Sequence, residues 1–313
     1  MTLFPFLSPA LMALAAVLLD RLLGEPRRWH PLVGFGWLAQ RMEAFLYSPA
    51  ATQPFFLRLR GAAAVLLPLA GAAFLVHAAQ RGLDAWAWTL TIPLLYLAIG
   101  ATSLEEHAAE VRRALNAGDL ELARQKVGRM VSRDTGEMDE AAVARAAVES
   151  VLENGCDAVL GALFWFLVAG APGAVLYRLA NTLDAMWGYK TDRYRDFGWA
   201  AARLDDALNW VPARLTALTY TLLGRSRSAW RCWRTQARGW ESPNAGPVMA
   251  AGAGALLLRL GGPAIYQGRP EMRPVLGEGR EVVPADIARA ASLMRRGIWL
   301  WLAVALIVGW ALA

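Results

Sequence analysis

Charged side chains are scarce in this 313-residue chain. Asp, Glu, Lys and Arg together make up 19% of the residues, whereas about 25% is usual in soluble domains. Hydrophobic residues make up 56%. The length alone would allow two soluble domains, but long apolar runs favour one membrane bundle with polar loops.

Cysteine and several common motifs are also missing. The two cysteines, Cys156 and Cys232, have no CxxC spacing, which excludes a disulfide framework and a cysteine zinc site. No GxxxxGK[ST] loop occurs, so any ATP site is not of the P-loop kind. The net charge is +6, but the basic residues form no single stripe, which argues against a nucleic-acid partner. No basic residue precedes the first apolar run, so we expect that run to be a retained helix.

Five apolar runs approach the length that spans a bilayer. They cover residues 3–19, 61–79, 85–104, 158–176 and 297–313. Each needs a helix because hydrocarbon offers backbone groups no other partner. The expected fold class is therefore all-α: a polytopic helical membrane bundle of about 5–7 membrane helices, with cytoplasmic and re-entrant helices. We expect one domain over residues 1–313, including a cytoplasmic helical segment at 105–157.

The distribution of basic residues predicts the topology. Residues 20–60 hold six Arg and no Lys, and residues 105–157 are long and charged, so both should face the cytoplasm, with an outer turn near Arg81. The fourth run is interrupted by Gly170-Ala171-Pro172-Gly173, where the chain either crosses once or folds back. Two weaker runs, 200–223 and 247–260, are expected to be buried or re-entrant helices rather than lipid-facing spans.

Three polar clusters precede the fourth run. Asp20, Glu25 and His30 adjoin the first helix. The acids could bind Mg²⁺, or the segment could simply be an ordinary helix end followed by a turn. Arg129 and Arg133 stand beside a predicted helix start that Asp134 or Thr135 can cap, a plausible phosphate site. Glu149, Glu153 and Asp157 follow i, i+4, i+8 spacing, so they should share one helix face that either is solvated, with Arg145 as a neutralising partner, or binds a metal.

A fourth cluster of polar residues follows. It comprises Asn181, Asp184, Lys190, Arg193, Arg203, Asp205, Asp206, Asn209 and Arg214. Ionisable residues in an apolar helix are costly and by default mark function, with internal Arg–Asp pairing as the structural alternative. Arg203, Asp206 and Asn209 can share a face. Asn244 belongs to a fifth segment, where Ser242 to Gly246, Leu260 to Gly262 and Tyr266 to Gly268 are typical of loops and turns.

In this order the motifs resemble the adenosylcobinamide-phosphate synthase family of cobalamin biosynthesis (CobD/CbiB). The resemblance covers nearly the whole chain. It is carried by the following motifs: Asp20 with Gly24-Glu25-Pro26 and His30-Pro31, Arg133-Asp134-Thr135, Glu149-Ser150 with Glu153-Asn154 and Asp157, Tyr177-Arg178 with Asn181-Thr182-Leu183-Asp184, Gly188-Tyr189-Lys190, Ala202 to Asp206 with Asn209 and Pro212-Ala213-Arg214, and Ser242 to Gly246. Glu25 departs from the expected Asp and keeps the carboxylate.

The resemblance implies a ligase that forms an acid–amine bond. Such a ligase would join the propionate carboxylate of adenosylcobyric acid to (R)-1-aminopropan-2-ol, usually as its O-phosphate, and would depend on ATP and Mg²⁺. The expected partners are these substrates, the lipid bilayer, other late cobalamin-pathway membrane enzymes and further copies of the chain. The expected location is the bacterial inner membrane, with several spans and the active site facing the cytoplasm. Because ATP and corrinoid are cytoplasmic, this favours the fold-back at residues 170–173.

For such a reaction we assign hypothetical roles to the clusters. Glu149, Glu153 and Asp157 would bind Mg²⁺; Asp205 or Asp206 would be the base, with Asp184 a third catalytic candidate. The remaining candidates are assigned to substrate or phosphate: Asp20, Glu25, His30, Arg129, Arg133, Asn181, Lys190, Arg193, Arg203, Asn209, Arg214 and Asn244.

Two other functions are compatible with the same residues. A membrane transporter also combines intramembrane Asp, Arg and Asn with a broken helix, but no inverted repeat is evident here. A non-catalytic, signalling-type relative of the family would carry a diluted version of the motifs, whereas the acidic and Asn-Thr-Leu-Asp motifs are intact in this chain.

Overall fold

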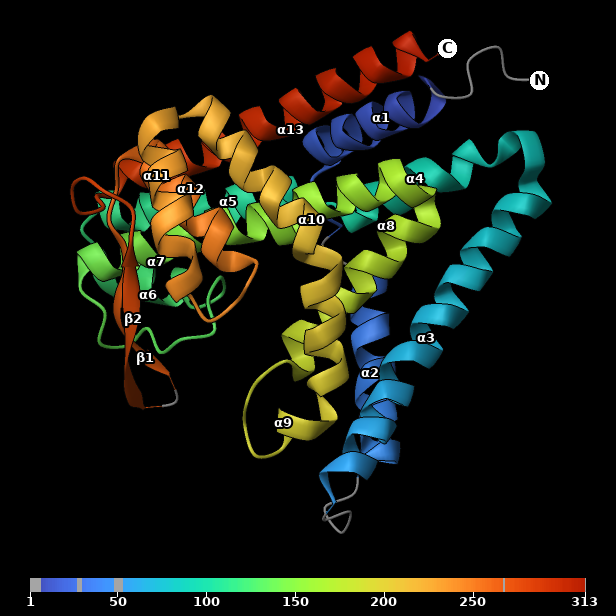
Figure 1. Ribbon diagram of the computed structural model, residues 1–313, viewed down its shortest axis with the longest axis horizontal. Coiled ribbons are helices and arrows are strands. Elements are labelled where there is room, and N and C mark those ends of the chain that lie inside the picture. The colour runs from blue at the N-terminus through green and yellow to red at the C-terminus, as the bar shows by residue number, and fades with distance from the viewer. Residues whose placement is uncertain (1–6, 27–29, 48–52, 267, 313) are drawn as a thin grey trace. The chain divides into compact units, whose positions relative to one another are not determined.

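Helices dominate the computed structural model, which describes residues 7–26, 30–47, 53–266 and 268–312 (Figure 1). The expected class, a helical membrane protein, is confirmed. In the described residues, three helical stretches are long and apolar enough to cross a membrane: Pro54–Trp86, Glu140–Trp187 and Ala285–Ala311. The contacts divide the chain into two compact units, described in turn; the expectation of a single domain stays a prediction.

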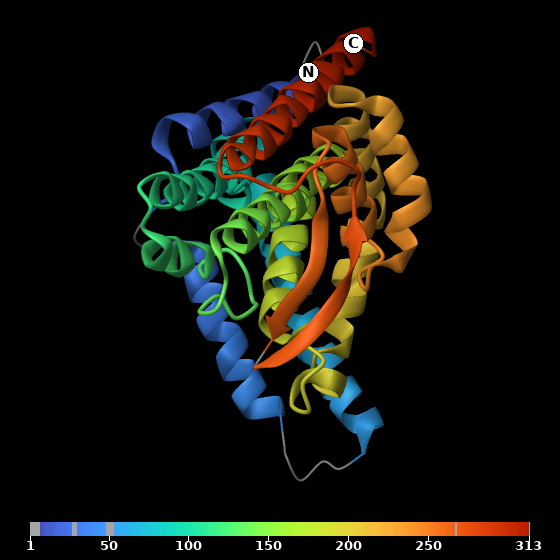
Figure 2. The same ribbon diagram turned by 90° about the vertical axis from the view of Figure 1, so that its left-hand side faces the viewer.

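The first unit comprises the described residues within Met1–Gly100, Gly161–Asn209 and Val304–Ala313. Its elements are α1 (Leu7–Leu23), α2 (Pro31–Leu46), α3 (Pro54–Leu83), the 3₁₀ turn η1 (Asp84–Trp86), α4 (Trp88–Ala98), α8 (Gly161–Trp187), α9 (Tyr194–Phe197) and the start of α10 (Trp199–Leu223). The helices α2, α3 and α8 lie side by side (Figures 1 and 2). Their buried core includes Leu69, Leu183 and Trp187, and the Trp187 ring meets Phe197 edge-on at 5.3 Å between centroids.

The outward side of α3 is apolar. Leu67, Phe74 and Leu75 are each more than 60% exposed, as expected of a helix whose outer face is covered by lipid. The inward side contains Gly61, Ala64, Val65 and Leu69, and Gly61 packs so closely on the backbone of Phe197 that any Cβ there would collide with it. A turn is found near Arg81, as expected, at η1, where the Gln80 amide donates to the Thr91 hydroxyl at 2.7 Å; its position on the outer side stays a prediction.

The third apolar run does not form one helix. It was expected over residues 85–104, but α4 ends at Ala98 and a new helix, α5 (Ala101–Asn116), begins after Gly100. Eleven residues rise about 16 Å, which is too short for a bilayer core of about 30 Å. The expectation of a continuous span at this position is therefore wrong.

The helix α8 reverses direction at its centre. Ala169 and Gly170 leave helical geometry, and Gly170 has a φ of +64°, which suits a residue without a Cβ. Gly173 consequently lies against the Trp165 backbone, and Gly161 lies against the Tyr177 ring. Residues 161 and 177 would be about 24 Å apart in a straight helix. These contacts confirm the predicted reversal at residues 170–173.

The second unit comprises Ala101–Leu160 and the described residues of Trp210–Ala303. Besides α5 and the end of α10, its elements are α6 (Leu120–Val127), α7 (Glu140–Asn154), the π-helix η2 (Gly155–Leu160), α11 (Ser226–Gln236), the 3₁₀ turn η3 (Ala237–Gly239), α12 (Ala245–Leu256), β1 (Leu260–Tyr266), β2 (Arg269–Leu276) and α13 (Ala285–Ala311). The helix α12 is buried along its whole length. Its glycines permit close packing: Gly252 lies against Leu152 and Gly254 against the backbone of Ala229 on α11.

A two-stranded antiparallel hairpin is the main departure from the all-helical expectation. Residues 260–268 were expected to form loops and turns, but β1 pairs with β2 from Leu260 opposite Leu276 to Tyr266 opposite Arg269 (Figure 2). An isolated hairpin is marginally stable in water. This one is fixed to the loop before α7, because Asp134 donates its N–H to Ile265 and accepts the N–H of Gly268.

Candidate functional site

The first unit contains a half-buried carboxylate held by neutral donors. Asp205 lies on α10, and the amide of Asn209, one turn later, donates to Asp205 Oδ2 at 3.0 Å. The amide of Asn181 on α8 donates to Asp205 Oδ1 at 3.4 Å. The Tyr177 hydroxyl in turn donates to Asn209 Oδ1 at 2.7 Å. Tyr177 and Asn181, like Asp205 and Asn209, are four residues apart, so each pair projects from one face of its helix.

The reversal of α8 makes this network possible. Tyr177 is fully buried, and Gly161 leaves room for its ring because any larger residue would overlap the phenol. The Trp165 indole, from the half of α8 before the reversal, donates to the carbonyl of Leu208 on α10 at 3.0 Å. Both halves of α8 therefore hold α10 at the position where Asp205 meets its amide donors.

Burial raises the pKa of Asp205 to about 6, against the opposing effect of hydrogen bonds from Asn209 and Asn181. A carboxylate with this pKa is mostly ionised at neutral pH and still binds a proton readily. These properties suit a general base.

Asp206 has a different environment from its neighbour. Its carboxylate is 3.1 Å from Arg203, one turn earlier, and Lys190 acts on it electrostatically. Burial nevertheless raises the pKa of Asp206. The Arg203–Asp206 pairing that the sequence indicated is confirmed, but Asn209 joins Asp205 instead. Asp184 stands in the last turn of α8, where its carbonyl accepts the N–H of Gly188.

The N-terminal motif also belongs to the first unit. His30 begins α2, and its Nδ1 accepts the N–H of Leu32 at 3.2 Å while its Nε2 lies 3.8 Å from Glu25. Burial lowers the pKa of His30 against the opposing charge of Glu25, and the charge of Arg178 acts with burial. Arg178 in turn donates to Asn181 Oδ1 at 3.4 Å. His30 is thus linked through Arg178 to the network around Asp205.

Asp20 and Glu25 lie near a hydroxyl that sequence reasoning did not single out. The Tyr96 hydroxyl of α4 donates to the carbonyl of Gly24 at 2.6 Å. Burial raises the pKa of Tyr96, and the charges of Asp20 and Glu25 act in the same direction. Asp20 itself is 1% exposed. The first unit therefore contains residues of two predicted clusters: Asp20, Glu25 and His30, and most of the cluster that includes Asp205.

Arg193 binds a carboxylate instead of standing open to phosphate. Its Nη2 lies 2.6 Å from Glu43 of α2, a buried residue that also accepts the indole N–H of Trp187 at 3.0 Å and the hydroxyl of Tyr194. The Arg193 guanidinium also lies over the ring of Tyr47. These contacts secure the loop after α8, and a phosphate-binding role for Arg193 stays a prediction.

A second buried carboxylate, in the second unit, is held by positive charge. Glu149 of α7 is 2% exposed and pairs with Arg133. Arg273 of β2 approaches Glu149 Oε2 at 3.0 Å, and the N–H of Gly261 donates to Oε1 at 2.7 Å. Arg145, which the sequence offered as the neutralising partner, lies instead 3.6 Å from Glu281. That expectation is wrong.

The predicted magnesium ligands do not form a set. Glu149 already uses both oxygens on two guanidinium groups and a backbone N–H. The α-helical spacing also fails, because the chain turns into the π-helix η2 at Gly155, before Asp157. Within the described residues, no group of three or more His, Cys, Asp or Glu side chains is arranged to hold a metal ion. Glu149, Glu153 and Asp157 therefore do not fit Mg²⁺ in this arrangement.

The start of α7 is already capped by a carboxylate, and a phosphate site there stays a prediction. Asp139 caps it by accepting the N–H of Ala142 at 2.7 Å, so a carboxylate occupies the helix end that Asp134 or Thr135 was expected to cap. Arg129 is exposed and acts electrostatically on Glu110. Arg214 of α10 donates to Asn244 Oδ1 at 2.6 Å, so the structure brings together two candidates from separate predicted clusters.

Comparison with known proteins identifies the family. Residues 13–294 match the family described as CobD/Cbib protein. The chain belongs to the CobD/Cbib family. Relatives named cobalamin biosynthesis protein CobD include one from Chromobacterium violaceum, 61% identical over 96% of both chains, and one from Stutzerimonas stutzeri, 56% identical over 98% of this chain and all of the relative. A third, from Mycobacterium tuberculosis, is 41% identical over 91% of both.

No solved structure matches this CobD/Cbib chain. Its geometry reveals residues that sequence patterns missed, namely Arg273, Glu43 and Tyr96. No local signal distinguishes Arg273, because it lies 124 residues after Glu149 on a strand that was expected to be loop. Tyr177 stood within the motif that carried the family resemblance, although no role was assigned to it.

Proposed function

We propose that this membrane protein acts in cobalamin biosynthesis as an adenosylcobinamide-phosphate synthase. It would form the amide between the propionate carboxylate of adenosylcobyric acid and (R)-1-aminopropan-2-ol or its O-phosphate, at the expense of ATP. Membership of the CobD/Cbib family supports the pathway. The observation that carries the reaction class is Asp205, a half-buried carboxylate with neutral hydrogen-bond donors and a pKa raised to about 6.

The proposed chemistry proceeds most simply through an acyl phosphate. The propionate oxygen attacks the terminal phosphorus of ATP, ADP leaves, and the amine nitrogen then attacks the acyl carbon. As the carbon–nitrogen bond forms, inorganic phosphate leaves and the nitrogen must lose a proton. Asp205 would accept that proton, and the Asn209 and Asn181 amides would hold its carboxylate in place. Magnesium would enter with the nucleotide, and no step is assigned to a protein-bound ion.

Other predicted residues retain proposed binding roles. Lys190 and Arg203, both exposed beside Asp206, would attract the phosphate of the amine substrate. Asp20, Glu25 and His30 would contact the corrinoid, since their link through Arg178 reaches the network of Asp205.

The direct test is an assay of amide formation. Purified protein is incubated with adenosylcobyric acid, aminopropanol phosphate and Mg-ATP, and the product is identified by its mass. We expect the amide with the wild type and with Asp192→Asn, an exposed matched control on the loop before α9, and little with Asp205→Asn. Absence of product with the wild type, or full activity of a folded Asp205→Asn variant, would contradict the proposal.

We also propose that the loop after α8 faces the cytoplasm of a bacterial inner membrane. Both native cysteines are buried, so an introduced cysteine reports with little background. A membrane-impermeant maleimide applied to intact cells should label Gly82→Cys, near the predicted outer turn, and spare Tyr189→Cys. Ready labelling of Tyr189→Cys would reverse the proposed orientation.

A further inference from the structure

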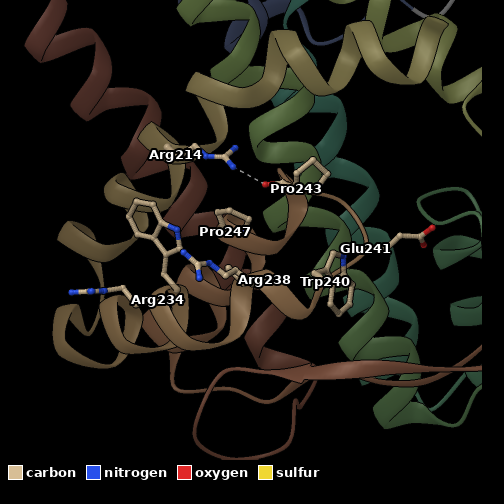
Figure 3. A pocket seen from close by; sticks show the side chains of 9 residues that line it. Arg214, Arg234, Arg238, Trp240, Glu241, Pro243 and Pro247 are labelled. Atoms are coloured by element: carbon tan, nitrogen blue, oxygen red, sulfur yellow. Dashed lines mark hydrogen bonds between the residues drawn. The ribbon is translucent and has the colours of Figure 1, made fainter. Parts of the chain in front are cut away.

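A pocket of about 620 Å³ opens in the second unit, and none of the residues bonded to Asp205 lines it. Parts of α10, α11, η3 and the start of α12 surround it (Figure 3). Its lining residues are Arg214, Trp233, Arg234, Ala237, Arg238, Trp240, Glu241, Pro243 and Pro247. Three guanidinium groups and two indole rings are an unusual lining, and the volume falls in the range of small-molecule sites.

Arg214 brings a half-buried positive charge to this pocket. It donates to the carbonyls of Trp210 at 3.0 Å and Pro243 at 2.9 Å, and to the Asn244 side chain at 2.6 Å. All three acceptors are neutral, and burial lowers the pKa of the guanidinium. The contacts fix the position of Arg214 without neutralising it. A fixed, uncompensated guanidinium attracts an anion.

The other two arginines of the pocket are also uncompensated. In the described part of the chain, neither Arg234 nor Arg238 forms an ion pair with a carboxylate. Glu241 lies at the rim, and in Figure 3 its side chain is directed away from the arginines.

A second cavity in the same unit has a different arrangement of arginines. There Arg280 and Arg289 both pair with the buried Asp286, at 2.6 Å each. A third lining arginine, Arg296, donates to the carbonyl of Leu223 at the end of α10. Two of its four arginines are therefore paired with a carboxylate, whereas in the described residues none of the three arginines of the first pocket forms such an ion pair.

The aromatic part of the lining is held in place from behind. The guanidinium of Arg273 lies 5.4 Å from the centre of the Trp240 ring, and Arg273 is itself bound to Glu149 at 3.0 Å. One face of the indole is thus covered by a buried, ion-paired arginine. A planar ring of a ligand could stack on the pocket-facing side of Trp240. Because Trp240 is already held in place, its side chain would lose little conformational freedom on binding.

We propose that this pocket binds the nucleoside triphosphate that the proposed reaction consumes. This inference rests on the proposed function. The three arginines would bind the phosphate oxygens, as guanidinium groups do with two parallel hydrogen bonds, and Trp240 would stack on the base. The ion pair of Glu149 with Arg133 and Arg273 then serves as the support of the stacking face rather than as a metal site.

The test measures binding of a non-hydrolysable ATP analogue to the full-length protein, purified in phospholipid-free detergent, without corrinoid. We expect Arg238→Gln and Trp240→Leu each to weaken binding about tenfold or more. Arg227→Gln, an exposed arginine of α11 outside the pocket, and Trp299→Leu on α13 are the matched controls and should leave affinity unchanged. Arg238 is exposed, so its replacement leaves the fold intact.

Competition distinguishes the possible phosphate sources. ATP should displace the analogue, whereas inorganic phosphate and aminopropanol phosphate, which lack a ring, should displace it only at far higher concentration. Equal displacement by either compound, displacement by an anionic phospholipid, or unchanged affinity in Arg238→Gln and Trp240→Leu would overturn the nucleotide pocket. Normal binding by a protein that makes no amide would instead contradict the proposed function alone.

Discussion

Glu149 and Asp205 occupy opposite electrostatic environments. Glu149, in the second unit, is bound by Arg133, Arg273 and the N–H of Gly261. Asp205, in the first unit, is bound by two amide side chains, and the charge that acts on it is that of another acid, Asp206. Both carboxylates stand on helices within polar motifs, and both were predicted from the sequence to be site residues.

The difference separates a structural carboxylate from a reactive one. Two guanidinium groups hold Glu149 in its charged form, and removing it would leave those charges buried without a partner. Neutral donors orient Asp205 but do not prevent it from taking up a proton. The contrast therefore supports the proposed role of Asp205 in proton transfer, whereas Glu149 holds loop, helix and hairpin together.

The largest effect should follow replacement of Glu149. In Glu149→Gln the cationic groups of Arg133 and Arg273 lose their counter-charge, which costs about 3–5 kcal/mol for a broken buried ion pair. Thermal unfolding in detergent should show a large loss of stability, with Glu137→Gln, an exposed acid before α7, unchanged. A Glu149→Gln variant as stable as the control would mean that the pair is dispensable.

Replacement of Asp205 should instead lower enzymatic activity and leave stability nearly unchanged. Asp205→Asn keeps the side-chain shape and removes the proton acceptor, so we expect amide formation to fall about 10²- to 10⁴-fold with little change in unfolding temperature. Asp206→Asn, whose partner Arg203 is exposed, should lose less. Steady-state rates beside melting curves test this, and equal loss in both variants would remove the distinction between the two acids.

The pH dependence of the rate and of the stability tests the same contrast between Asp205 and Glu149. Because the proposed base has a pKa of about 6, the rate should fall as the pH drops below about 6, and Asp205→Asn should lose this dependence. The raised pKa also lowers stability as the pH rises from 3.8 to about 6, because the folded chain binds more protons in that window than the unfolded chain. Asp205→Asn should remove that part of the stability profile. A rate profile unchanged in the variant would exclude Asp205 as the titrating group.

The smallest effect concerns the support of the network. Gly161→Ala adds a methyl group where the Tyr177 ring lies, and overpacking of this kind typically costs about 1–3 kcal/mol. Gly71→Ala in α3 meets nothing and serves as the control. Unfolding temperature and amide formation should both fall in Gly161→Ala only. Equal behaviour of the two variants would show that α8 adjusts without cost.

The sequence predicted the parts of the fold that depend on local rules. Apolar runs identified the helices α1, α3, α8 and α13, and the Gly-Ala-Pro-Gly stretch predicted the reversal of α8. The break at Gly100 and the π-helix at Gly155 were missed, because neither carries a strong local signal. The hairpin was missed because Gly and Pro in β1 and β2 are typical of turns, and its pairing is fixed by Asp134 more than 120 residues earlier.

The site was predicted where partners are close in sequence. Arg203 with Asp206 follows helical spacing, as the structure confirms. The spacing of Glu149, Glu153 and Asp157 misled, because helical geometry changes before the third residue. Spacing also could not show that Arg133 and Arg273 converge on Glu149 or that Trp240 lies against Arg273, since such contacts depend on tertiary packing.

The ion pair of Glu149 has a consequence for the order in which the second unit is assembled during synthesis. Arg133 and Glu149 are only 16 residues apart, so both leave the ribosome early and can meet at once, whereas Arg273 follows 124 residues later. Until the hairpin emerges, Glu149 has one arginine and lacks the N–H of Gly261. The arrival of the hairpin therefore completes the unit, and a nascent chain that stops before residue 273 should remain a substrate for membrane quality-control proteases.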